Sequence, residues 1–401
     1  MAMTSRRWAI LAVCVLGTVV AYIHRLGLAP LVPMLVADLG VAYAGAGVLV
    51  TAYFWTYAAV QVPLGVLTDR VGARHTMLLS LAVLAVGIVA FSLSRGFGEG
   101  LAARCLVGLG AAGFWLPALR LIRDWFPPHE RGRATGLCSA GGGAGGTAAL
   151  LFLPALADDL GWRWAYATTL APLLLMVALT AAVVRDVPAD RTPEEARAVP
   201  VPPLAALGRV LSTGALWPLA VASLCAYGGF LGLVTWLPTF LVRDHRLSAT
   251  AAGQVTSLVM AAITVSWPLA GVVADRTGRP RALAVTSLVL GAGACLLFAG
   301  LPRGTGAPAL AATAATTGLV LGGMLMPYLL VLERFPAALV GTAAGVVNTC
   351  WLLGGLAVPA ALGVLLDATG SFGQVLAACA GLVALAAASM ALAREPARAT
   401  G

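Results

Sequence analysis

The sequence lacks lysine and has few charged residues of either sign. Charged side chains make up 10% of its 401 residues, whereas hydrophobic side chains make up 60% and the mean hydropathy is +0.94. Soluble domains are roughly a quarter charged, so this composition excludes a water-soluble globular protein. The 25 basic residues are all arginines, scattered along the chain without a basic run interleaved with aromatics. We therefore expect no nucleic-acid partner.

The sequence also lacks the residue patterns of an enzyme or a metal protein. The seven cysteines form no Cys-x-x-Cys pair and fall in apolar segments, as buried reduced thiols do. No hydrolytic triad, metal-ligand cluster or nucleotide-binding loop is present. The glycine run from Gly141 to Gly146 follows no strand and precedes no Lys-Ser/Thr pair, so it indicates close helix packing rather than phosphate binding. We expect no enzymatic activity, no metal and no cofactor.

Long apolar stretches, in contrast, fill the chain. Each is long enough to cross ~30 Å of hydrocarbon as a helix, and none alternates as barrel strands do. The predicted fold is an all-α integral membrane protein of twelve transmembrane helices, over residues 8–36, 43–67, 75–94, 99–126, 133–157, 163–184, 214–241, 249–273, 281–300, 308–332, 341–366 and 372–393. The first stretch is too long for the apolar region of a cleaved signal peptide.

The two halves of the chain repeat each other. The segment from Gly65 to Gly72, which contains Asp69-Arg70, returns 206 residues later as Gly271 to Gly278 with Asp275-Arg276. A second set recurs after 209 residues: Gly132, Gly136, Gly145, Gly146, Asp158 and Gly161 return as Gly341, Gly345, Gly354, Gly355, Asp367 and Gly370. We predict two pseudo-symmetric six-helix bundles, residues 1–184 and 214–401, joined by a cytoplasmic linker over residues 185–213.

The arginines also predict how the chain crosses the membrane. If the N-terminus is cytoplasmic, 17 arginines fall on the inner loops and ends and 5 on the outer ones. Basic residues concentrate on the cytoplasmic side of membrane proteins. We therefore expect a multi-pass protein of a bacterial inner membrane, surrounded by lipid, with both termini in the cytoplasm.

The duplicated loop resembles the signature between the second and third helices of the major facilitator superfamily. The matching residues are Gly65, Asp69, Arg70, Gly72 and Arg74, with Asp275 and Arg276 in the second copy. The resemblance extends over essentially the whole chain and implies a secondary transporter, which we expect to be a monomer that works by alternating access. In that family the aspartate lies at the start of a facing helix and the arginine pairs with an acid, which latches the cytoplasmic side. The resemblance therefore implies gating roles for Asp69, Arg70, Arg74, Asp275 and Arg276.

The fourth predicted helix resembles the anion:cation symporter branch of the same family. The match comprises Arg104-x-x-x-Gly108-x-Gly110 and the segment from Arg120 to Ala134. The resemblance implies that Arg25 and Arg104 face an anionic substrate, and we expect Arg120, Asp124, Glu130 and Arg131 to contribute to an inner gate. His24 and Ala111 replace acids that the branch often carries.

Two other branches of the family match less well. The helix-5 proline of drug/proton antiporters is missing from the glycine run between Gly141 and Gly146, and the interior arginines of nitrate porters are missing from the second and eighth predicted helices.

Arg25 is the strongest candidate for a binding residue. It lies about 17 residues, or roughly 26 Å of helix, after Trp8, beyond easy snorkelling reach of the surface. Because no acid lies in the middle of a predicted helix, a transported anion is its natural counter-ion. The alternatives are a structural cation bonded to carbonyls and a gating or proton-coupling residue. For Arg104, nearer a helix end, a structural role competes evenly with substrate contact.

Neutral polar and aromatic residues complete the predicted site. His24 is a candidate for proton coupling or a polar spacer between helices. Tyr53, Tyr57 and Gln61 recur every four residues and so share one helix face. The full set of neutral candidates is Tyr22, Tyr53, Tyr57, Gln61, Tyr227, Trp236, Trp267, Tyr328, Asn348 and Trp351. Packing or interface anchoring is the alternative for each aromatic residue.

The functional prediction is a carrier for a small organic or inorganic anion, coupled to protons or to exchange of a second anion. One alternative is a proton-coupled exporter of drugs or metabolites, in which the aromatics bind apolar cations. A transporter-like solute sensor is an alternative of another class.

Overall fold

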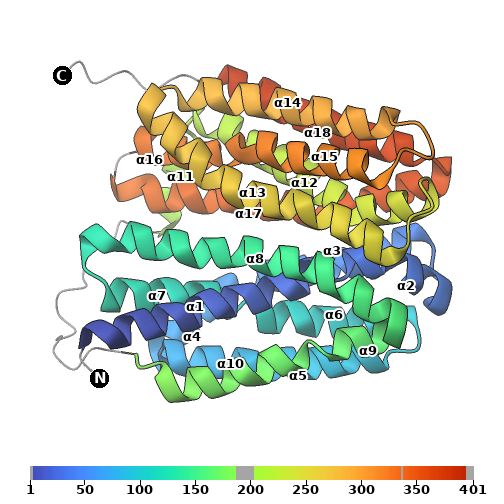
Figure 1. Cartoon of the computed structure of the whole chain (residues 1–401). Helices are drawn as coiled ribbons and strands as arrows, with labels where there is room; N and C mark the ends of the chain where they lie inside the picture. The colour runs from blue at the N-terminus through green and yellow to red at the C-terminus, as the bar shows by residue number, and fades with distance from the viewer. Residues whose placement is uncertain (1–2, 187–202, 336, 394–401) are drawn as a thin grey trace. The chain divides into compact units, whose positions relative to one another are not determined.

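The computed structural model describes residues 3–186, 203–335 and 337–393. Every element in these ranges is helical (Figure 1). Eleven segments within them are long and apolar enough to cross a membrane. A further predicted span, the second, is divided at Val60 into α3 (Tyr43–Ala59) and α4 (Gln61–Val71), so neither part reaches that length alone. The predicted all-α membrane fold is confirmed.

The helices follow the predicted order closely. Before the linker they are α1 (Met3–Leu26), the short 3-10 helix η1 (Ala29–Leu31), α2 (Val32–Leu39), α3, α4, α5 (Ala73–Leu93), α6 (Phe97–Ala111), α7 (Trp115–Trp125), α8 (Pro128–Leu160), α9 (Trp162–Ala167) and α10 (Leu170–Val183). After it they are α12 (Leu216–Arg243), α13 (Ala249–Thr277), α14 (Pro280–Gly300), α15 (Ala307–Val320), the 3-10 helix η3 (Leu321–Leu325), α16 (Met326–Arg334), α17 (Ala337–Thr369) and α18 (Phe372–Leu392).

Several predicted helices are interrupted where a proline follows. A proline cannot donate to the carbonyl four residues earlier, so the helix ends or distorts near that carbonyl. Pro30 follows the end of α1 at Leu26 by four residues, and Pro63 follows the end of α3 at Ala59 by the same distance. Pro117 follows Gly113, which lies in the break between α6 and α7, by four residues. Pro154, Pro238, Pro268 and Pro359 nevertheless lie inside uninterrupted helices.

The described chain forms two compact units. Within the described residues, one contains 3–186 with 247–257, and the other contains 203–246, 258–335 and 337–393. In the first unit α1 packs along α8 and α5 along α6; in the second α12 packs along α17, and α18 packs on both α12 and α14 (Figure 1).

The predicted linker contains one helix that the sequence reasoning missed. It is α11 (Pro203–Leu211), which begins at a proline and consists mainly of leucine, alanine and valine. Residues 187–202 of the linker lie outside the described residues.

Glycines let the two main helix pairs approach backbone to backbone. A Cβ added to Gly145 of α8 would lie 2.2 Å from the Val19 carbonyl oxygen of α1. In the second unit, a Cβ added to Gly354 of α17 would lie 2.2 Å from the Leu224 carbonyl oxygen of α12. The glycine run of the first half is therefore a helix-packing surface, as predicted.

Alanine at either close contact is expected to destabilise its unit. Gly145→Ala and Gly354→Ala each place a methyl group against a main-chain oxygen that cannot move aside, and such overpacking costs roughly 1–3 kcal/mol. Thermal unfolding of the purified protein measures the effect. Gly136→Ala on α8 is the matched control, because a Cβ there meets nothing within 4 Å. Equal unfolding temperatures for the control and the two variants would contradict the packing argument.

Candidate functional site

Arg25 lies deep within the first membrane-spanning segment. That segment runs from Arg6 to Leu39, so Arg25 lies 19 residues after its start and 14 residues before its end. The side chain is 7% exposed. A buried guanidinium at this depth requires polar or polarisable surroundings.

Four aromatic rings surround the Arg25 guanidinium. Its Cζ lies 4.5 Å from the ring centre of Tyr22, 4.9 Å from Tyr57, 5.5 Å from Phe54 and 5.6 Å from Tyr53. Distances below about 6 Å allow the negative face of a ring to attract the cation. These residues, from α1 and α3, are called the aromatic cage below.

The cage is held in place by contacts of its own. The Tyr53 and Tyr57 rings stack with centroids 5.6 Å apart, which agrees with their predicted common face. The Tyr53 hydroxyl donates to the Ala21 carbonyl of α1 at 3.4 Å. Gln61, the third member of the predicted face, begins α4 just beyond the break at Val60.

Arg104 is fully buried and joins three helices. Its Nε donates to the Leu49 carbonyl of α3, and its Nη1 donates to the His24 carbonyl of α1 and to the Tyr166 hydroxyl of α9, each at 3.1 Å. Its exposed fraction is 0%. These hydrogen bonds fit a structural role for Arg104. A structural role and substrate contact are the two alternatives that the sequence left open for this residue.

His24 belongs to the same network. Its Nδ1 lies 3.4 Å from the Tyr166 hydroxyl. In the described part of the chain, His24 Nε2 and Arg104 Nη2 are both buried without a hydrogen-bond partner. Two donor-capable atoms thus remain available in this network for an acceptor.

Polar contacts gather where α1 and α8 begin. Arg7 Nη1 lies 3.0 Å from the Glu130 carboxylate. Arg120 donates to the Thr68 carbonyl at 2.5 Å and lies 3.6 Å from the Asp124 carboxylate. The predicted gate residues Arg120, Asp124 and Glu130 therefore all make polar contacts: Glu130 with α1, and Arg120 with α4 and with Asp124 of its own helix α7.

Asp186 caps the start of α5, a role that the sequence reasoning missed. Its Oδ1 accepts from the Arg74 backbone N–H at 2.8 Å, and the Arg74 side chain donates to the Ala181 carbonyl at 2.7 Å. A carboxylate at a helix N-terminus is favoured by the helix dipole. Gly72 permits this approach, because its φ is +88° and a Cβ would meet the carboxylate.

The remaining predicted gate residues and one predicted binding residue, Tyr328, make no contact described above. Arg276 is exposed. The side chains of Asp69, Arg70, Arg131, Asp275 and Tyr328 lie outside the part of the chain that the structure describes. Their predicted roles stay predictions.

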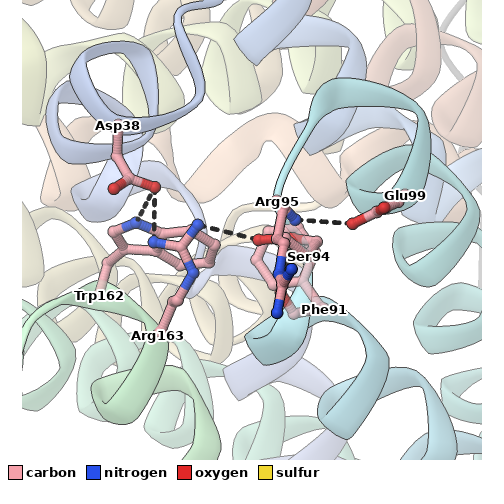
Figure 2. Close-up of polar contacts among 7 residues, drawn as sticks. All are labelled: Asp38, Phe91, Ser94, Arg95, Glu99, Trp162 and Arg163. Atoms are coloured by element: carbon pink, nitrogen blue, oxygen red, sulfur yellow. Dashed lines mark hydrogen bonds and ion pairs between the residues drawn. The ribbon is translucent and has the colours of Figure 1, made fainter.

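A second polar cluster, also missed from the sequence, lies where α2 ends and α9 begins. Asp38 Oδ2 accepts from Trp162 Nε1 at 3.2 Å and from Arg163 Nη1 at 2.6 Å (Figure 2). Arg163 Nη2 also donates to the Ser94 carbonyl, at 2.9 Å. The cluster therefore joins the ends of α2 and α5 to the start of α9. Nearby, the Glu99 carboxylate accepts from the Arg95 backbone N–H at 2.7 Å (Figure 2).

The candidates of the second unit differ in their surroundings. Tyr227 of α12 stacks on Trp351 of α17, with ring centroids 4.4 Å apart. Trp236 is fully buried and its Nε1 donates to the Pro359 carbonyl at 3.0 Å, a contact between packed helices. Asn348 is exposed and Trp267 is half-buried.

Comparison with known proteins places this chain in a family. The sequence matches the family described as Major Facilitator Superfamily over residues 14–359 and 241–400. The chain therefore belongs to the major facilitator superfamily. It is a transporter and not an enzyme, as predicted.

Its relatives include transporters of anions. "Probable nitrate/nitrite transporter NarK2" of Mycobacterium tuberculosis (strain CDC 1551 / Oshkosh) is 31% identical over 84% of each chain. "D-galactonate transporter" of Escherichia coli O6:H1 is 28% identical over 91% of this chain and 90% of its own. The similarity to a nitrate/nitrite transporter differs from our expectation that nitrate porters match less well. That expectation rested on the lack of interior arginines in the second and eighth predicted helices.

A solved structure supports the fold. A bacterial homolog of the human lysosomal transporter Spinster, in an inward-facing and occupied conformation, has a TM-score of 0.84 over 98% of this chain and 97% of its own. Its sequence identity is 19%, so the likeness concerns the fold alone.

Removal of Arg104 is expected to destabilise the protein. Arg104→Ala leaves buried carbonyl groups of two helices without their charged donor, which we expect to cost roughly 1–3 kcal/mol. Arg95→Ala, at an exposed position, is the control and is expected to change stability by at most about 0.5 kcal/mol. Thermal unfolding in detergent measures both. An Arg104→Ala protein as stable as the control would contradict the structural role.

Proposed function

We propose that this protein transports a small anion and that Arg25 binds it. The observation that carries the proposal is the placement of a guanidinium within an aromatic cage, deep in the first span. The planar guanidinium offers two parallel N–H donors, which match the oxygen pairs of carboxylate and nitrate. The anion-transporting relatives support the same class of cargo.

The charges of the first unit favour a monovalent anion. Arg104 is fully buried and spends two nitrogens on backbone carbonyls and a tyrosine hydroxyl. Arg25 is then the guanidinium that contacts the cargo in this proposal, and one guanidinium pairs with one negative charge. Nitrate and galactonate, the substrates in the names of two relatives, both carry one negative charge.

The alternating-access mechanism, the coupling and the membrane are parts of the same proposal. The two units carry repeated sequences, and transporters with internal repeats move the repeats against each other around a bound solute. The arginine distribution supports a bacterial inner membrane with both termini in the cytoplasm. The transporter works as a monomer and takes either protons or a second anion as its coupling partner.

Neutralising Arg25 is expected to abolish most transport. The test measures uptake of labelled nitrate and D-galactonate into proteoliposomes, and Arg25→Gln should lower the uptake rate at least about tenfold, the equivalent of one lost charged contact of about 1.4 kcal/mol. Arg25→Lys, which keeps the charge without the planar fork, should retain part of the activity. Both variants should unfold cooperatively. If wild-type protein transports an anion and Arg25→Gln transports it equally well, Arg25 is not the ligand.

Proton coupling through His24 has its own test. We expect an inward proton gradient to accelerate uptake by the wild type and to leave His24→Gln unaffected, because glutamine keeps a polar side chain but cannot carry the proton. Exchange of internal for external anion without a gradient should persist in the variant. If acceleration survives in His24→Gln, His24 is not the coupling residue; if the wild type ignores the gradient, exchange is the mode of coupling.

A further inference from the structure

The two glycine contacts give the register in which the units repeat. Gly145 approaches the Val19 carbonyl as Gly354 approaches the Leu224 carbonyl, with the same 2.2 Å from an added Cβ. Residue numbers therefore shift by 205 between α1 and α12 and by 209 between α8 and α17. The second shift equals the one seen in the sequence repeat.

In this register both units place a tyrosine against the same position of the partner helix. Tyr22 of α1 corresponds to Tyr227 of α12, and Gly142 of α8 corresponds to Trp351 of α17. A Cβ added to Gly142 would lie 2.8 Å from Cε2 and 2.9 Å from Cζ of Tyr22. Tyr227 instead stacks on the Trp351 indole, with ring planes 17° apart.

The residue three positions after each tyrosine differs in charge between the two units. Arg25 of α1 corresponds to Phe230 of α12, whose ring centre lies 6.2 Å from that of Tyr227. The unit with a large side chain on the partner helix has phenylalanine where the other unit has arginine. The unit with the guanidinium, 4.5 Å from the Tyr22 ring, has a glycine on the partner helix. Tyr22 is partly exposed, whereas Tyr227 is 5% exposed.

We propose that Gly142 determines the specificity of the Arg25 site, because its lack of a side chain lets the Tyr22 ring lie against α8 and leaves room beside the guanidinium for the larger anions. This inference rests on the proposed function of Arg25 as the anion ligand.

The packing of α1 on α8 makes the effect of a side chain at Gly142 specific. Gly141 and Gly145 hold the two backbones in contact, since added Cβ atoms would lie 2.6 Å and 2.2 Å from carbonyl oxygens of α1. The helices therefore cannot separate without losing this contact. The atoms that a methyl group at position 142 would meet belong to the far end of the Tyr22 side chain, which can rotate. Restoring an ordinary carbon–carbon separation of about 3.5–4.0 Å moves the ring roughly 1 Å away from α8.

The experiment compares Gly142→Ala with Gly136→Ala, the same substitution on the same helix where a Cβ meets open space. Binding of nitrate, acetate and D-galactonate to the purified proteins is followed by thermal shift, which reports ligand affinity by mass action. We expect Gly142→Ala to weaken the largest anion that the wild type binds by about tenfold relative to the smallest, equivalent to about 1.4 kcal/mol. Gly136→Ala should match the wild type.

Tyr22 provides the second arm. In a Tyr22→Leu background the ring is gone, so Gly142→Ala should no longer change the preference among anions; this coupling distinguishes displacement of the ring from general damage to the helix pair. Tyr22→Leu alone should shift preference toward the larger anions, which keeps the proposal testable if Gly142→Ala does not fold. A preference that is the same in Gly142→Ala and Gly136→Ala, or an effect that persists without the Tyr22 ring, overturns the role of Gly142.

Failure of the proposed function gives results that differ from failure of the Gly142 inference alone. If wild-type protein binds none of the three anions, or if Arg25→Gln binds them as well as the wild type does, the anion site at Arg25 is wrong and the inference falls with it. If binding depends on Arg25 and ignores position 142, only the inference falls.

Discussion

The buried guanidinium of Arg25 is the constraint around which the first unit is organised. A charge deep in a membrane is expensive unless protein groups replace its hydration. Tyr22 and the α3 aromatics provide polarisable surfaces, and Arg104 ties the carbonyls of α1 and α3 together beside them. The contacts of the two arginines differ: four rings surround Arg25, whereas Arg104 donates to the backbone of α1 and α3 and lies near two rings.

The sequence alone predicts the spans and the repeat, because both depend on composition and spacing. It also places Tyr53 and Tyr57 on one face, where their rings stack. It cannot predict the partners of Arg104, since every residue has a carbonyl and only the fold decides which ones face the guanidinium. The contacts of Asp38 with Arg163 and of Asp186 with Arg74 join residues more than a hundred positions apart, and no local pattern marks them. Nor do prolines reveal by themselves which helices break, because Pro154 and Pro359 lie in helices that continue.

The internal repeat is informative where the copies disagree. Glycines that bring backbones into contact, Gly145 and Gly354, are kept in both units, because the packing of each helix pair requires them. Arg25 and Phe230 occupy equivalent places with opposite chemistry. Duplication thus provides each half with an internal reference, and positions such as Arg25 and Phe230 show where the two halves differ in charge and bulk.

The helix breaks near Pro30 and Pro63 lie next to the Arg25 cage, one at the end of α1 and the other at the end of α3. Arg25 lies just before the end of α1 at Leu26, and Tyr57 just before the end of α3 at Ala59. Bending of a helix concentrates where its hydrogen-bond ladder is interrupted. The far end of the first span is held by Trp162 and Arg163 through Asp38 (Figure 2). A small change in the angle between α1 and α2 at Gly27 would therefore rotate the Arg25 guanidinium among the rings of the cage, while Asp38 keeps the end of α2 bonded to α9.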